Sequence, residues 1–287
     1  MGLGERKGVA PRVTCAALWM NANEIPIWSS RENPLMNAQA SSFRARLAFA
    51  YRRAKSLWGS AESDFRSSEY LRHNQRRQEH LASLGLSLAG KTVLETGAGI
   101  GDHSTFFLDR GCAMTITDGR PENVKYLKER FPRERVQLLD LEAPVDFQEH
   151  SQVVYCYGTL YHLANPAEAL EYLSRNCQEL LLLETCVSYG AQEEMNPIRE
   201  PRSQVSQAVS GYGCRPTRTW IYSELKKHFS FVYLPVSQPW HEEFPTDWRD
   251  QKVGLGAQLT RAVFVASRTA LENPNLSVDI PIIQIRH

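Results

Sequence analysis

The sequence predicts an α/β protein built on a doubly wound, mostly parallel β-sheet. Three observations support this prediction: short apolar runs recur after Gly90, polar helix-forming segments separate them, and the first run leads directly into a glycine-rich turn. Apolar runs of this length are typical of strands buried on both faces, and strands that alternate with helices form parallel sheets. The chain has 287 residues, 42% of them apolar, which is enough for one large domain with an extension.

Two segments are predicted along the chain, an N-terminal arm with a helix over residues 1–64 and the main domain over residues 65–287. Residues 1–40 contain Gly, Pro and Asn without sustained periodicity, which is typical of an irregular arm. Apolar residues recur at helical spacing from Ser42 to Trp58, and another helix is expected over about Ser67–Leu84. Both helices precede the sheet and form an N-terminal helical extension.

Seven strands are expected after Gly90. Their apolar runs are TVLET, AMTITD, VQLLD, QVVYCYG, ELLLLET, FVYLPVS and RAVFVAS. Helices are expected over HSTFFLDRG, PENVKYLKERF, NPAEALEYLSRN and TWIYSELKKHF; in the third, Asn165 is the expected N-cap and Pro166 a first-turn residue. No helix separates the last two strands, so we expect them to form an antiparallel hairpin at the sheet edge.

Composition and charge narrow the classes of protein. No apolar run approaches the ~20 residues that span a bilayer, and no secretion signal is recognisable, so we expect a cytoplasmic protein without membrane contact. The six cysteines form no Cys-x-x-Cys pair and are interpreted as buried free thiols. Residues 1–80 carry 13 Lys and Arg against 7 Asp and Glu, a net charge of +6, and the remainder carries −5. The basic segment suits either an RNA partner or a solvated helical face.

The stretch KTVLETGAGIGDHS places Gly97, Gly99 and Gly101 directly after a buried strand. Glycine permits positive φ and has no Cβ, so the backbone can turn sharply and approach a ligand at the end of the strand. The dinucleotide fingerprint would need glycine where Asp102 stands, and no Gly-Lys-Ser/Thr follows as in a phosphate-binding loop. The turn therefore indicates another nucleotide-type cofactor, or a tight strand-to-helix connection that binds nothing.

The pattern E-x-G-x-G-x-G that begins at Glu95 resembles the first motif of the class I S-adenosylmethionine-dependent methyltransferases. The resemblance covers roughly residues 65–270 and implies a seven-stranded sheet of the class I methyltransferase type, with the terminal hairpin as its distinguishing feature. It also implies S-adenosyl-L-methionine as cofactor, with Asp118 near the ribose and Asp140 near the adenine, and a helical extension that covers the cofactor cleft. The expected cofactor-binding residues are Glu95, Gly97, Ala98, Gly99, Gly101, Asp118, Gly119, Asp140, Leu141 and Tyr157.

The segment YCYGTLYHLANP, residues 155–166, bears on the methyl acceptor. It lacks the Asn/Asp-Pro-Pro-Tyr/Phe pattern of enzymes that methylate exocyclic or amide nitrogens, and Cys156 lacks the preceding proline of cytosine C5 methyltransferases. Its GTLYHLANP part resembles small-molecule and sugar methyltransferases and, more weakly, tRNA wobble-uridine carboxymethyltransferases. The resemblance makes Tyr161 and His162 the candidate catalytic residues. His162 is interpreted either as a general base or as a histidine that fixes the loop.

The predicted function is methyl transfer to a small polar or anionic acceptor. The alternatives are an RNA-modifying enzyme that methylates or carboxymethylates tRNA, a NAD-dependent enzyme, which Asp102 disfavours, and a catalytically silent cofactor-binding module. Arg261 matches a cation that holds the extra carboxylate in the carboxymethyltransferases, but the N-terminal lysine they also use has no equivalent here. Residues 185–217 are the expected substrate lid. The expected substrate-binding residues are Arg199, Arg202, Arg215, Arg218, Trp240, His241 and Arg261.

No metal ion is expected. His241, Glu242 and Glu243 are metal-ligating residue types, but they are consecutive in the sequence, and consecutive side chains rarely converge on one ion. The oligomeric state stays open.

Overall fold

The structure is a computed structural model, and it describes residues 65–147, 150–201, 207–249 and 259–287. The predicted arm, the predicted helix from Ser42 to Trp58 and the predicted substrate residue Arg202 lie outside the described residues. The domain boundary after residue 64 stays a prediction.

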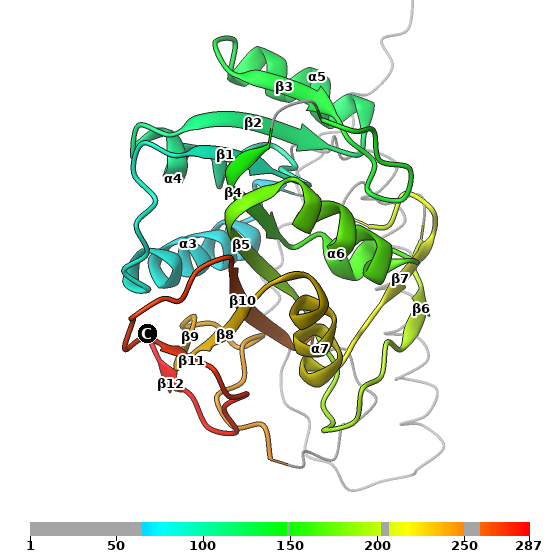
Figure 1. The fold of residues 1–287 in the computed structure, drawn as a ribbon. Coiled ribbons are helices and arrows are strands. Elements are labelled where there is room, and N and C mark those ends of the chain that lie inside the picture. The colour runs from blue at the N-terminus through cyan, green and yellow to red at the C-terminus, as the bar shows by residue number, and fades with distance from the viewer. Residues whose placement is uncertain (1–64, 148–149, 202–206, 250–258) are drawn as a thin grey trace, which may run out of the picture. The chain divides into compact units, whose positions relative to one another are not determined.

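An eight-stranded sheet forms the centre of the described part, in the order β11-β8-β10-β5-β4-β1-β2-β3 (Figure 1). The strands are β1 (Thr92–Glu95), β2 (Ala113–Asp118), β3 (Arg135–Leu138), β4 (Ser151–Tyr157), β5 (Cys177–Cys186), β8 (Phe231–Pro235), β10 (Arg261–Ser267) and β11 (Leu276–Ser277). Strands β3, β2, β1, β4 and β5 pair in parallel, whereas β10 is antiparallel to both β5 and β8. The predicted mostly parallel sheet and its reversed hairpin are confirmed. The two-residue β11 is an eighth strand, too short to leave a pattern in the sequence.

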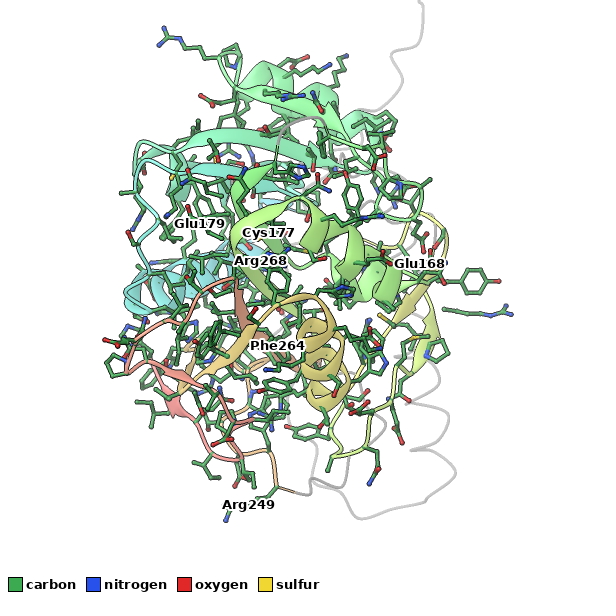
Figure 2. The ribbon with its side chains drawn as sticks, in the orientation of Figure 1. Glu168, Cys177, Glu179, Arg249, Phe264 and Arg268 are labelled. Carbon is green, nitrogen blue, oxygen red and sulfur yellow. The ribbon has the colours of Figure 1, made fainter. Side chains whose placement is uncertain are left out.

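Helices cover both faces of the sheet, as the alternating pattern predicts. They are α3 (Ser68–Ser83), α4 (Ser104–Leu108), α5 (Pro121–Arg130), α6 (Pro166–Arg175) and α7 (Arg218–His228). Alternate residues of β4 serve the two layers: Val153 and Tyr155 pack with apolar residues of α3, α4 and α5, whereas Val154 and Cys156 pack with those of α6 and α7. Side chains fill the space between sheet and helices, and Phe264 of β10 is fully buried there (Figure 2).

Local capping explains where several helices begin. The Ser67 hydroxyl accepts a hydrogen bond from the Tyr70 amide at the start of α3, and Thr217 does the same for Trp220 at the start of α7. Asn165 occupies the N-cap of α6 without a side-chain capping bond, and Pro166 fills the first helical position as predicted.

Smaller elements surround the carboxyl edge of the parallel strands. The 3-10 helix η1 (Leu160–His162) follows β4, and β6 (Pro197–Arg199) pairs antiparallel with β7 (Tyr212–Cys214) inside the expected lid. Farther along, β9 (Ser237–Gln238) pairs in parallel with β12 (Ile285–Arg286). The five described cysteines are buried and free, and none of the described helices is long and apolar enough to cross a membrane.

Candidate active site

A cavity of about 280 Å³ lies at the carboxyl edge of the parallel strands. Parallel sheets of this kind bind ligands at that edge because the loops that follow the strands converge there. The predicted site residues that line the cavity are Gly97, Gly99, Asp118, Gly119, Asp140, Leu141, Tyr157, Tyr161, His162 and Arg261. Glu95 and Ala98 line a smaller adjoining hollow, which shares Gly97 and Tyr157 with the cavity. The structure thus brings most of the predicted cofactor residues to one place.

The glycine turn approaches the loop after β4 closely. Gly97 has a φ of +65°, and a Cβ at this position would overlap the Thr159 side chain. Thr159 in turn donates a hydrogen bond to the Thr96 carbonyl at 3.2 Å, so the two loops are tied together. Gly101 has a different neighbourhood: a Cβ there would meet Phe131 and Leu127, and the residue is not among those that line the cavity.

Asp118 connects the end of β2 to the glycine turn. Its carboxylate accepts hydrogen bonds from the backbone amides of Gly99 and Arg120, each at 2.8 Å, and from the Asn123 side chain at 3.1 Å. Burial raises the pKa of Asp118, and these three donors act in the opposite direction. Because an ionised carboxylate can accept about four hydrogen bonds, Asp118 retains acceptor capacity for a ligand hydroxyl.

Glu95 is a buried acid in the smaller hollow. Its side chain is 2% exposed and accepts a 2.5 Å hydrogen bond from the Ser104 hydroxyl. Burial raises the pKa of Glu95 to about 7, although the Ser104 bond lowers it. A cationic group bound beside this carboxyl would favour its ionised form.

His162 and Glu200 form a hydrogen-bonded pair at the cavity wall. The Nδ1 atom of His162 lies 2.5 Å from one carboxylate oxygen of Glu200, and this oxygen also accepts from the Ala208 amide at 2.8 Å. The other oxygen of Glu200 accepts from Arg215 at 3.3 Å. Burial lowers the pKa of His162, and Glu200 opposes this effect. The pair fixes the imidazole tautomer and leaves Nε2 as the nitrogen available to a ligand. Glu200 was not predicted, because an acid within a lid segment gives no sign of its partner.

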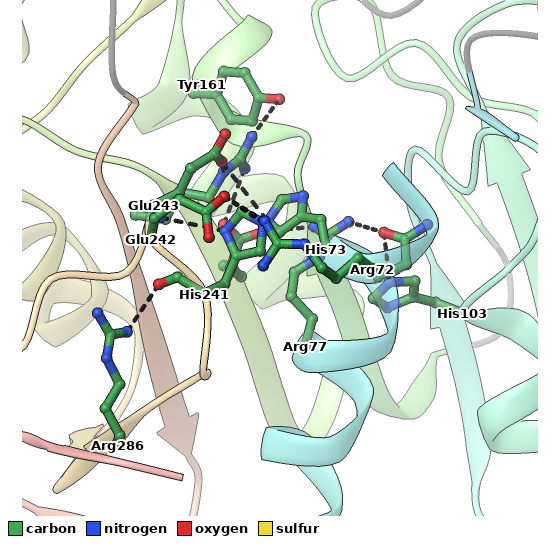
Figure 3. Close-up of polar contacts among 12 residues, drawn as sticks. Arg72, His73, Arg77, His103, Tyr161, His241, Glu242, Glu243 and Arg286 are labelled. Carbon is green, nitrogen blue, oxygen red and sulfur yellow. Dashed lines mark hydrogen bonds and ion pairs between the residues drawn. The ribbon is translucent and has the colours of Figure 1, made fainter. Parts of the chain in front are cut away.

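A buried ion network lies next to this pair, on β5. Glu184 is fully buried and accepts hydrogen bonds from Arg77 at 2.8 Å and from Arg261 at 3.0 Å. Arg261 also donates to Glu243 at 2.5 Å and to the Tyr161 hydroxyl at 3.2 Å (Figure 3). Burial alone would raise the pKa of Glu184, but the two guanidinium groups lower it. Since two carboxylates balance Arg261, it offers no uncompensated charge to an additional carboxylate on the cofactor.

Helix α3 contributes a polar face that sequence analysis missed. Tyr70, His73 and Arg77 line the cavity, and Asn74 lines the adjoining hollow. Their spacing of three and four residues places them on one side of the helix. The only available signal was this spacing, and polar residues at such positions are usually a solvated face.

The remaining predicted substrate residues lie elsewhere. Arg199 lies over the Tyr212 ring, Arg218 lies 3.8 Å from the Trp248 ring centroid, and Trp240 is 61% exposed. Arg215 donates a hydrogen bond to the Glu200 carboxylate, and His241 is buried against the ring of His73. None of these five residues is among the described residues that line the cavity.

Comparisons with known proteins agree with this architecture. Residues 94–179 match a family model described as a methyltransferase domain. Among solved structures, the N-terminal domain of EvdMO1 with SAH bound is similar at 20% identity and a TM-score of 0.52, over 73% of this chain and 85% of that one. The same domain in the presence of SAH and D-fucose gives 18% identity and a TM-score of 0.52, over 70% and 84%.

A third similar structure is the Burkholderia thailandensis 1,6-didemethyltoxoflavin-N1-methyltransferase, with 18% identity over 85% of this chain and 94% of that one and a TM-score of 0.44. No curated protein matches this chain.

The described sheet has the class I S-adenosylmethionine-dependent methyltransferase fold. The chain's methyltransferase domain is recognised over residues 94–179. The class and the cofactor predicted from the glycine motif are confirmed. The cavity suits this cofactor chemically, because acids at strand ends can accept from ribose hydroxyls and can face an ammonium group. The individual contacts remain predictions.

One contact can be tested directly. Asp118→Ala is expected to weaken S-adenosylmethionine binding by about 1–3 kcal/mol, the usual cost of leaving hydroxyl groups without a buried partner. Titration calorimetry measures the change, and Glu122→Ala, at an exposed acid in the first turn of α5, is the control for loss of a negative charge. Equal affinities for the two variants would remove Asp118 from the cofactor site.

Proposed function

We propose that this methyltransferase transfers the methyl group to a hydroxyl of a small polar acceptor, with His162 as general base. The observation that carries the proposal is the 2.5 Å contact between His162 and Glu200 at the cavity wall. A hydroxyl must lose its proton as it is methylated, whereas an amine or thioether acceptor can react without a base. A neutral imidazole oriented by a carboxylate is suited to take that proton.

The proposed reaction is an in-line displacement. The bound cofactor supplies an electrophilic methyl group on a sulfonium, and the chain's own residues position the acceptor and exclude water. The cofactor would supply the methyl group to the acceptor oxygen and would keep the electron pair of the broken carbon–sulfur bond. His162 Nε2 receives the hydroxyl proton, and Glu200 stabilises the resulting imidazolium.

The charges around the cavity favour a neutral polar acceptor over a strongly anionic one. Three of the described arginines line the cavity. Glu184 and Glu243 balance Arg77 and Arg261, and Arg120 lies beside Asp118. Asp118, Asp140 and Glu142 add acids to the lining. A polyhydroxylated molecule would find acceptors and donors here without needing a free cation.

The test is an acceptor panel assayed by release of the demethylated cofactor. Neutral polyols and deoxy sugars, of which D-fucose is a convenient member, are compared with carboxylates, amines and thiols, and the product is analysed for its methylated atom. Turnover of a hydroxyl compound with an O-methyl product is the expected result. Exclusive transfer to nitrogen or sulfur would contradict the proposal, and tRNA as the only acceptor would favour the RNA-modifying alternative.

A further inference from the structure

Two buried histidines with unsatisfied nitrogens face each other beside the cavity. His73 on α3 is 7% exposed and His241 is 4% exposed, and their ring centroids lie 4.6 Å apart. The Nε2 atoms of both rings are buried without a hydrogen-bond partner. A polar atom left unpaired in the interior destabilises the folded state. Two unpaired Nε2 atoms in one place indicate a ligand that both can bind.

A carboxylate completes the cluster. One oxygen of Glu243 lies 3.8 Å from His73 Nε2, and single ligand atoms of His73, His241 and Glu243 all lie within 4.8 Å of one another. Ligand atoms around a tetrahedral ion with bonds of about 2.0–2.1 Å are roughly 3.3 Å apart. Small side-chain rotations therefore bring the three atoms to coordination distance. Figure 3 shows the three side chains gathered at this point.

We propose that His73, His241 and Glu243 bind one transition-metal ion of the imidazole-preferring class, such as Zn²⁺. Two imidazoles and one carboxylate are a donor set that suits Zn²⁺, Co²⁺ or Ni²⁺ and not Mg²⁺ or Ca²⁺, which prefer all-oxygen ligands. Three protein ligands leave a fourth position for water or another ligand. Because His73 also lines the cavity, the ion would lie beside the acceptor space. The inference does not depend on the proposed methyl transfer.

The environment keeps both rings in the form that binds metal. Burial, followed by the charges of Arg77 and Arg261, holds the pKa of His73 far below its ordinary value. Burial likewise lowers the pKa of His241. Neutral imidazole is the ligating form, so no proton has to be displaced from an imidazolium near pH 7.

Two nearby interactions compete with the ion. Glu243 is held by Arg261 at 2.5 Å, and the Nδ1 atom of His241 accepts a long 3.3 Å hydrogen bond from the Glu243 amide. Ligation through Nε2 places the His241 proton on Nδ1 and gives up that long bond. Glu242 lies 3.8 Å from His241 Nε2, but its carboxylate is ion-paired with Arg72 and adds little net negative charge to the site.

The sequence pattern singles out His241 and Glu243 but cannot complete the site, because the third ligand, His73, lies 168 positions before His241. His241 and Glu243 alone are only two ligands on one loop, and the third arrives from α3.

The experiment uses the full chain without a histidine tag, treated with a chelator and then titrated with Zn²⁺ in a calorimeter. Co²⁺ serves as a spectroscopic probe, since visible absorption reports its ligand geometry. One Zn²⁺ per chain is expected. His73→Gln and His241→Gln should each weaken binding by more than the roughly 10–100-fold that loss of an outer-shell partner costs.

The matched control is His80→Gln. His80 is a fully buried histidine on the same helix, hydrogen-bonded to Ser237 and outside the cluster, so this variant should bind Zn²⁺ like the unaltered protein. If a histidine variant does not fold, the proposal is tested with Glu243→Gln, which should weaken Zn²⁺ binding, and with the Co²⁺ spectrum of the unaltered protein, which should report nitrogen and oxygen ligands. Absence of stoichiometric binding, or wild-type affinity in both cluster variants, would overturn the proposal.

Discussion

Replacing His162 by alanine is expected to lower kcat by about 10²–10⁴-fold while the affinity for S-adenosylmethionine stays the same. The first range is the usual contribution of a positioned general base. The second expectation follows because His162 is proposed to contact the acceptor and not the cofactor. Stopped assays with the acceptor found by the panel measure kcat, and calorimetry measures cofactor affinity. His150→Ala, at an exposed histidine, is the control.

The pH profile separates a base from a merely structural histidine. Because burial lowers the pKa of His162, kcat/KM should rise with pH through a value below the ordinary one of about 6.5 and be flat at neutral pH. Glu200 raises this pKa, so Glu200→Gln should move the limb to more acidic pH and lower the plateau. If Glu200→Gln does not shift the acidic limb of the kcat/KM profile and His162→Ala keeps full kcat, then His162 and Glu200 only stabilise the loop.

Replacing Glu184 by glutamine is expected to lower the free energy of unfolding by about 3–5 kcal/mol. Glutamine has nearly the same shape, but it leaves Arg77 buried without a carboxylate partner and leaves Arg261 paired with Glu243 alone, which is the costly way to break a buried ion pair. Urea unfolding followed by circular dichroism measures the change. The predicted loss is large compared with the total stability of an ordinary domain.

The control lies on the same strand. Glu179 pairs with Lys91, but its side chain is 41% exposed, so Glu179→Gln should change stability by about 1 kcal/mol or less (Figure 2). The pKa of Glu184 is lowered in the folded state, so its contribution is present at neutral pH and is lost as the pH falls through that lowered pKa. Equal effects of the two substitutions would show that the Glu184 network contributes no more than a surface pair.

The fold was predictable because each of the seven longer strands of the central sheet carries its own signal. Runs such as TVLET and RAVFVAS are apolar enough to be recognised as strands without other information. No helical pattern separates the last two runs in the sequence, and this absence predicted that β10 is antiparallel to β8. Asp118 and Asp140 were predictable as site residues for a similar reason: the carboxyl ends of neighbouring parallel strands share one edge of the sheet.

The rest of the site depends on partners that local patterns do not reveal. Glu184 stands within an apolar strand and Arg77 within a polar helix, and neither shows that it will pair with the other, 107 residues away. The lid arginines are predicted only from their charge and their place in or beside a loop segment, and Arg218 lies against Trp248 and donates to the Pro281 carbonyl. Charge in a loop indicates a polar surface but not the direction in which the side chain points.

Glu184 lies between its two arginine partners in the sequence, so the two ion pairs become possible at different times during synthesis. Arg77 emerges from the ribosome before this carboxylate, and Arg261 emerges 77 residues after it. Domains generally fold as units as their chains are made, and contacts between distant residues form late. Until β10 is made, Arg77 alone can balance Glu184, and Tyr161 lacks the guanidinium that holds its hydroxyl. The part of the cavity wall formed by Tyr161 and Arg261 is therefore complete only after β10 has been synthesised.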